Sequence, residues 1–365
     1  MKKFAVALRV FFVAVLWWTF AVIVSLRIKD VLGSTAGQRP VFPYPFLFTA
    51  LLNLGVFLWS FIVTRLLPIL LYRARKLPYS STGSQHLRLL PREVFVLLLI
   101  GSLQGVELAL NNMSYQFLSL SMNRMVMACC VVFQLFTAIA WRLEEIRMLK
   151  WVAAVMLVLG GLIQGMPCAQ VRTPLLAAIC GTHPPASREQ RDSLLGWVLV
   201  GASVLTSTNR WAFTQYIFQR SPPTSAIRRL TKFQLLLYMS IGTTAVCVLL
   251  ASFFERRAFA QVAHIGDKIT AIAARTSLCI VVVMVCELLI VSMTAATVMV
   301  ILSVVHNIPI VLAGIVFCHD RVFRNQWIGF ALCIAGAALY LLARNWDQSV
   351  LEADAEVVVE EQSLC

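Results

Sequence analysis

The chain has 365 residues, 59% of them hydrophobic, and a mean hydropathy of +0.81. This composition excludes a soluble globular protein and leaves room for many membrane spans of about 20 residues each. A formal net charge of +14 would suggest nucleic acid as a partner of a soluble protein, but most of these cations lie in loops beside apolar segments, so nucleic-acid binding is not expected.

Long apolar segments follow one another along the chain, each bounded by polar residues. The first has a basic start but is longer than the apolar part of a signal peptide and lacks a small-residue cleavage site, so we expect it to remain as a span. Run length and flanking residues predict ten transmembrane helices, at 5–26, 46–71, 93–115, 119–141, 149–167, 194–219, 226–254, 277–294, 296–318 and 325–343.

The loops between these segments orient the chain. Positive residues cluster between the second and third segments, at Arg73, Arg75, Lys76, Arg88 and Arg92. Because cytoplasmic loops are enriched in Lys and Arg, this cluster places that loop and both termini in the cytosol. The acidic tail, 346–365, is then a solvated cytosolic end, and the loop 168–193 is lumenal.

The two halves of the chain resemble each other. A shift of 176 residues superposes Glu144 on Asp320, Trp151 on Trp327 and Gly160 on Gly336. Five spans are an odd number, so the second half, 194–345, must insert upside down relative to the first half, 1–167. The sequence thus predicts an all-α polytopic membrane protein built as a 5+5 inverted repeat, with a substrate site near the bilayer midplane between the repeats.

Four sequence motifs point to a known family. They are FPYPFLFTAL at 42–51, RLEEIR at 142–147, RWAFTQ at 210–215 and QWIGFALC at 326–333. With them, roughly residues 5–345 resemble the triose-phosphate and nucleotide-sugar translocator family of the drug/metabolite transporter superfamily, in the branch near the GDP-fucose transporters. The resemblance implies the ten-helix drug/metabolite transporter fold. It also implies an antiporter that exchanges a nucleotide-sugar or sugar-phosphate for a nucleotide monophosphate or phosphate across a Golgi or endoplasmic reticulum membrane.

The chain also departs from that family. Relatives in the branch carry cations, thought to meet the phosphate, where this chain has Met127, Met293 and His306. Methionine has no charge, and an ordinary histidine is mostly neutral at pH 7, so the family's anion clamp cannot simply be transferred. A carrier of a different, less anionic metabolite is therefore an alternative.

Cations inside apolar segments are the first candidates for a site, because a charge at the bilayer centre normally faces a polar cavity or a partner. Arg210, in the same motif as Gln215, suits bidentate contact with phosphate. Its alternative role is an ion pair with Glu107 or Glu287. We take Arg210 as the leading substrate ligand and Gln215 as a further one.

Two more cations and an amide extend this set. Arg124 lies one helical turn from Met127 and can replace the missing cation there, or it can reach the headgroups. Lys232 is a candidate ligand, with an interfacial anchor as the alternative. Asn123, together with Asn112, is expected to supply polar lining.

Glu107 and Glu287 are acids deep in apolar runs, at nearly equivalent places in the two halves. Because an isolated buried carboxylate must be protonated or paired, the two either neutralise the intramembrane cations or couple transport to protons. His306, which with Pro309 interrupts the ninth segment, is a candidate ligand or proton-sensitive gate, and its alternative is a neutral core histidine.

Other chemistry is less well supported by the sequence. Cys168 and Cys180 share a polar loop and can form a disulfide if that loop faces an oxidising lumen. No metal-ligand spacing or hydrolase motif is present, so we expect no metal, no cofactor and no enzyme activity. The expected partners are a small phosphorylated metabolite and the lipid bilayer, with a homodimer left open. The remaining alternative is a membrane protein that does not transport and binds partners through its tail.

Overall fold

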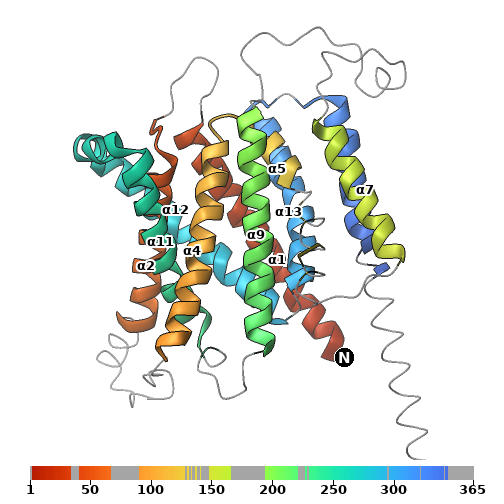
Figure 1. Ribbon diagram of the computed structural model, residues 1–365, viewed down its shortest axis with the longest axis horizontal. Helices are drawn as coiled ribbons and strands as arrows, with labels where there is room; N and C mark the ends of the chain where they lie inside the picture. The colour runs from red at the N-terminus through yellow and green to blue at the C-terminus, as the bar shows by residue number, and fades with distance from the viewer. Residues whose placement is uncertain are drawn as a thin grey trace, which may run out of the picture.

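In a computed structural model, the described residues are 2–33, 41–66, 90–127, 148–165, 194–220, 227, 230–293, 296–320, 322–340 and 342–343, with isolated positions between 130 and 140. All regular structure in these residues is helical, and most of the helices run side by side as one bundle (Figure 1). The predicted loop 168–193, with Cys168 and Cys180, and the tail 346–365 lie outside them.

Each predicted span contains helix in its described residues. The first half contains α1 (Lys2–Leu32), α2 (Pro45–Phe61) with the π-helical turn η1 (Ile62–Leu66), α4 (Pro91–Ser114), α5 (Leu120–Met127) and α7 (Met148–Gly165). The second half contains α9 (Leu194–Arg220), α11 (Lys232–Phe254), α12 (Arg256–Met293), α13 (Ala296–Phe317) and a final helix over residues 324–340.

Within the described ranges, five helical segments are long and apolar enough to cross a membrane: Arg9–Leu32, Pro45–Leu66, Pro91–Ser114, Lys232–Phe254 and Asp267–Ile290. Shorter apolar helices cover Met148–Ile163 and Val305–Phe317. The protein is therefore a polytopic membrane protein. The count of ten spans stays a prediction.

Two helix starts differ from the prediction. The helix predicted from residue 226 begins as α11 at Lys232, because Thr231 caps it: the Thr231 hydroxyl accepts the Gln234 N–H, and the Gln234 side chain accepts the Thr231 N–H. The helix predicted from residue 277 begins as α12 at Arg256. Polar and charged residues lower the hydropathy of 256–276, yet buried Ala258 and Ile269 give this stretch a helical packing face.

Two carboxylates from the second half cap helices of the first half. Helix α2 begins with a proline and has no side-chain cap of its own, and the Glu255 carboxylate accepts the N–H groups of Phe46 at 3.1 Å and Leu47 at 2.9 Å. Asp320 accepts the N–H of Ser121, at the start of α5, at 2.8 Å. Both acids satisfy N–H groups that a helix start leaves unpaired.

Small residues let the helices approach closely. A Cβ added at Gly160 of α7 would lie 2.7 Å from the carbonyl oxygen of Gly329 in the final helix, and one added at Gly336 would lie 3.1 Å from the carbonyl oxygen of Ala153. These two helices lie side by side in Figure 1. The 176-residue shift exchanges the two contacts, so they have the reciprocal form of a two-fold interface.

The wider helix packing repeats this reciprocity. Helix α4 packs against α9 and α11, and α12 packs against α1 and α2. In the predicted repeat, α4 corresponds to α12, α9 to α1 and α11 to α2. Each neighbour of α4 thus has its counterpart beside α12, which is the pattern expected of two halves related by a two-fold axis.

Candidate functional site

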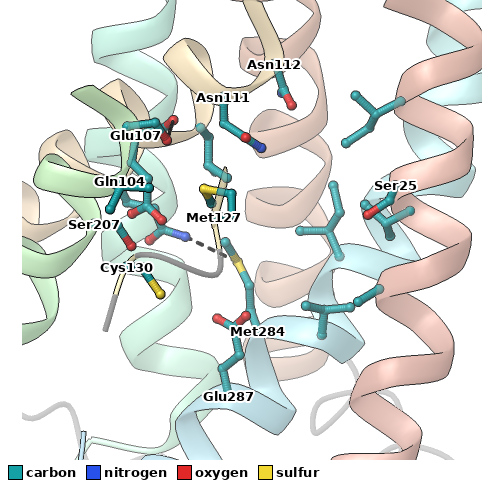
Figure 2. A pocket seen from close by; sticks show the side chains of 18 of the residues that line it. Ser25, Gln104, Glu107, Asn111, Asn112, Met127, Cys130, Ser207, Met284 and Glu287 are labelled. Carbon is teal, nitrogen blue, oxygen red and sulfur yellow. Dashed lines mark hydrogen bonds between the residues drawn. The ribbon is translucent and has the colours of Figure 1, made fainter. Parts of the chain in front are cut away.

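A cavity of about 220 Å³ lies between the two halves of the chain. Helices α1, α2, α4 and α5 line it from the first half, and α9, α12 and α13 line it from the second. Figure 2 shows Asn111 and Asn112 toward one end and Glu287 at the other. Among the described residues, the lining contains four ionisable side chains of Arg and Glu and a histidine: Arg124, Arg210, Glu107, Glu287 and His306.

Arg124 enters the cavity from α5. Its Nη2 donates to the hydroxyls of Ser25 on α1 at 2.8 Å and Tyr115 at the end of α4 at 2.7 Å. Its Nε is buried and has no hydrogen-bond partner. Within the described residues no carboxylate pairs with Arg124, so this guanidinium is neutralised by no acid and keeps a free donor.

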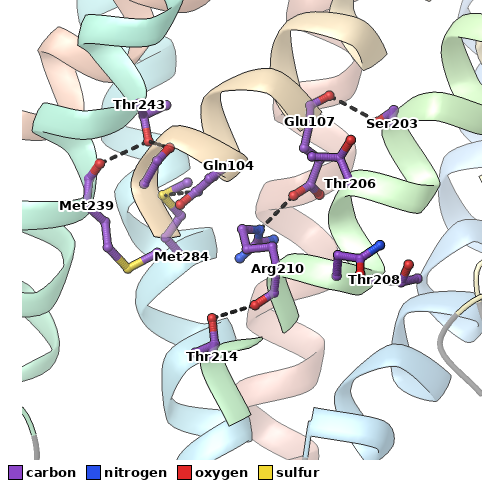
Figure 3. Close-up of polar contacts among 12 residues, drawn as sticks. Gln104, Glu107, Ser203, Thr206, Thr208, Arg210, Thr214, Met239, Thr243 and Met284 are labelled. Carbon is purple, nitrogen blue, oxygen red and sulfur yellow. Dashed lines mark hydrogen bonds and ion pairs between the residues drawn. The ribbon is translucent and has the colours of Figure 1, made fainter. Parts of the chain in front are cut away.

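Arg210 is already paired. Its Nε donates to the Glu107 carboxylate at 2.7 Å (Figure 3). Its guanidinium lies 4.3 Å from the ring centroid of Trp211. Arg210 is 5% exposed and Glu107 is 9% exposed. Of the two roles that the sequence left open for Arg210, this geometry is that of the ion pair between helices.

Within the described residues, Glu287 hydrogen-bonds to an aromatic residue and forms no ion pair, although the charge of Arg210 also acts on it. Its carboxylate accepts the indole N–H of Trp17 at 3.2 Å. His306 lies on the other side of Trp17. Its ring stacks on the Trp17 ring, with centroids 4.4 Å apart and planes 10° from parallel. Helices α1, α12 and α13 thus meet at one polar cluster in the cavity wall.

The other residues predicted for the site do not line the cavity, or their side chains lie outside the described residues. Asn123 is 0% exposed and donates to Asn111 and Ser114, so it supports the wall from behind instead of lining it. Lys232 is the first residue of α11 and does not line the cavity. Gln215 lies in α9, but its side chain is outside the described residues, as is that of Met293 in α12. Met127 lines the cavity.

The sequence argument missed the neutral partners of the charges. Ser25, Tyr115 and Trp17 complete the site, yet each is common in apolar helices or at their ends. Asn53 and Asn111 carried a stronger signal, because amides inside long apolar runs need a polar surrounding. Among the described residues, no group of three or more His, Cys, Asp or Glu side chains is placed to bind a metal ion.

Comparison with known proteins gives one informative relative. No protein-family model matches the chain. A probable sugar phosphate/phosphate translocator from Arabidopsis thaliana is 22% identical over 347 residues, which cover 93% of this chain and 73% of the plant protein. A solved structure described only as a crystal structure of a protein covers 94% of this chain and 98% of its own, with 19% identity and a TM-score of 0.42. The chain is thus a distant homologue of a plant protein with that name.

Proposed function

We propose that this protein is a secondary transporter that exchanges a phosphorylated metabolite of the sugar-phosphate type across a membrane by alternating access. The observation that carries the proposal is Arg124, a cavity cation whose hydrogen bonds within the described residues go to the neutral hydroxyls of Ser25 and Tyr115. A guanidinium with neutral partners and a free donor suits a phosphate, which brings its own negative charge and several acceptor oxygens.

The distant relative supports the same substrate class, since its name describes a sugar phosphate/phosphate translocator. The nucleotide-sugar alternative has less support, because a diphosphate carries more charge than Arg124, the one cavity guanidinium that no described acid pairs with, can balance. Met127 in the cavity wall favours the second candidate, a carrier of a less anionic metabolite, over a strong anion clamp.

The architecture and location follow from the same proposal. The reciprocal contacts of α4 and α12 support a 5+5 inverted repeat of ten helices, as in the drug/metabolite transporter superfamily. Membership of its triose-phosphate and nucleotide-sugar translocator family, a Golgi or endoplasmic reticulum membrane and cytosolic termini complete the proposed assignment. No enzyme activity is part of it.

The test is an exchange assay in proteoliposomes loaded with inorganic phosphate. We expect uptake of glucose 6-phosphate or glycerol 3-phosphate by the wild type and a loss of roughly 10- to 100-fold in Arg124→Ala, the value of a charge-assisted hydrogen bond. Arg92→Ala removes an exposed cation at the start of α4, outside the cavity, and serves as the matched control. Wild-type vesicles that take up no phosphorylated compound would contradict the proposal.

A further inference from the structure

The charges of the cavity are separated along its length. Ser25, the partner of Arg124, and Trp17, the partner of Glu287, lie eight residues apart on α1, a rise of about 12 Å. Glu107 on α4 and Tyr115, the residue after its end, have the same spacing. The cavity therefore has one level that contains Arg124 and another that contains Arg210, Glu107 and Glu287.

The second level is acidic. Among the described residues it contains one cation and two carboxyl groups, and the cation already gives its Nε to Glu107. Within the described part of the chain, Glu287 forms no ion pair, and its one hydrogen bond comes from the neutral indole of Trp17. His306, stacked on that indole, is the other titratable group here.

Glu287 is accessible to a molecule in the cavity. It is half-buried and lines the cavity wall, and Figure 2 shows its carboxylate directed toward the interior beside Met284. In its ionised form, a carboxylate in this position accepts hydrogen bonds from hydroxyl or ammonium groups and repels a second anionic group. A substrate with its phosphate at Arg124 would bring the far end of its molecule to this level.

We infer that Glu287 is a specificity-determining residue that restricts the substrate to phosphomonoesters whose remaining part is neutral and hydroxyl-bearing, or cationic. Phosphorylated carboxylic acids are rejected, because their second anion meets Glu287 while Arg124 is occupied by the phosphate. This inference rests on the proposed function and adds to it the chemical class of the substrate.

The experiment compares phosphorylated substrates that carry a hydroxyl, an amino or a carboxylate group away from the phosphate. Phosphate-loaded proteoliposomes are offered glucose 6-phosphate, glucosamine 6-phosphate or 6-phosphogluconate, and a three-carbon pair, glycerol 3-phosphate and 3-phosphoglycerate, covers smaller substrates. For the wild type assayed at about pH 8, which favours the ionised form of Glu287, we expect uptake of the neutral or amino compound to exceed that of the carboxylic acid by roughly tenfold, the effect of about one unfavourable charge contact.

The variants assign this preference to one side chain. Glu287→Gln keeps the shape of the side chain and removes its charge. We expect the ratio of neutral-compound uptake to carboxylic-acid uptake to fall to within about threefold of unity. Glu287→Asp keeps the charge and should keep the preference. Glu255→Gln makes the same chemical change outside the cavity and should leave the ratio as in the wild type, whatever its effect on the rate.

The outcomes separate the two proposals. Equal uptake of acid and neutral compounds by the wild type, or an unchanged ratio in Glu287→Gln, would overturn the inference and leave the proposed function intact. Failure of the wild type to take up any of the five compounds would overturn both. Because each ratio is measured within one preparation, partial loss of folded protein in a variant does not alter it.

Discussion

Arg210 on α9 and Glu107 on α4 form an ion pair between helices from opposite halves of the chain, with Nε and Oε2 2.7 Å apart. Both side chains are nearly excluded from solvent. The pair explains how an arginine and a glutamate persist deep in apolar segments, since each removes the cost of the other's charge. It also leaves Arg124 as the cavity cation that no described acid neutralises.

The first prediction concerns the stability that this pair provides. Arg210→Ala leaves the Glu107 carboxylate buried without its cation, so we expect the free energy of unfolding to fall by about 3 to 5 kcal/mol. Thermal unfolding in detergent measures the change. The double variant Arg210→Leu with Glu107→Leu should recover much of the loss, because no charge is left unpaired. Equal losses in the single and double variants would show that packing, and not charge, is responsible.

A second prediction concerns the hydroxyls that position Arg124. Tyr115→Phe removes one of two acceptors of its Nη2, so the guanidinium samples more orientations. We expect the KM for the phosphorylated substrate to rise by roughly tenfold, the value of one hydrogen bond to a charged group. Tyr238→Phe, which removes a hydroxyl from the cluster between α4 and α11, is the matched control. The same KM in both variants would argue against a positioning role for Tyr115.

Glu255 gives a prediction about pH. Burial raises the pKa of this carboxyl above its ordinary 4.5, although the N–H groups of Leu47 and Phe46 oppose the shift. The folded state then binds the proton more tightly than the unfolded state. Its contribution to stability is present below pH 4.5 and is lost as the pH rises through the raised value.

The measurement compares the wild type with Glu255→Gln, which does not titrate. As the pH increases from about 4 to about 8, the melting temperature of the wild type should fall relative to that of the variant. The difference should change within the window just above pH 4.5 and then become constant. A difference that is constant over the whole range would mean that the pKa is not raised.

Helix contact through glycine leads to a fourth prediction. A Cβ added at Gly101 of α4 would collide with the backbone carbonyl of Met239 in α11, and Gly101→Ala should cost about 1 to 3 kcal/mol by forcing the helices apart. Gly201 of α9 has nothing within 4 Å of such a Cβ. Gly201→Ala should therefore be neutral or stabilise by up to about 1 kcal/mol, through helix propensity. Melting temperatures in detergent test both, and equal effects would contradict the packing argument.

Much of the fold was predictable because a span depends on its own residues. The start of α9 matches the predicted boundary, and α4 and α13 match within about two residues, since long apolar runs flanked by charges determine where a helix enters and leaves a bilayer. The predicted start of α12 was wrong by twenty-one residues, because the first part of this helix buries one face only and has low hydropathy. The cap on α2 could not be predicted, since Glu255 is more than 200 residues away.

The sequence by itself determined that this is a membrane protein with charged groups in its apolar segments, because that follows from the transfer free energy of each residue into a bilayer. Only the tertiary structure decided which of those charges neutralise each other. Arg210 and Glu107 are 103 residues apart, and their pairing depends on the rotation and register of α9 against α4. The same packing left Arg124 among neutral hydroxyls. The role of each arginine is therefore a property of helix packing and not of the segment that carries it.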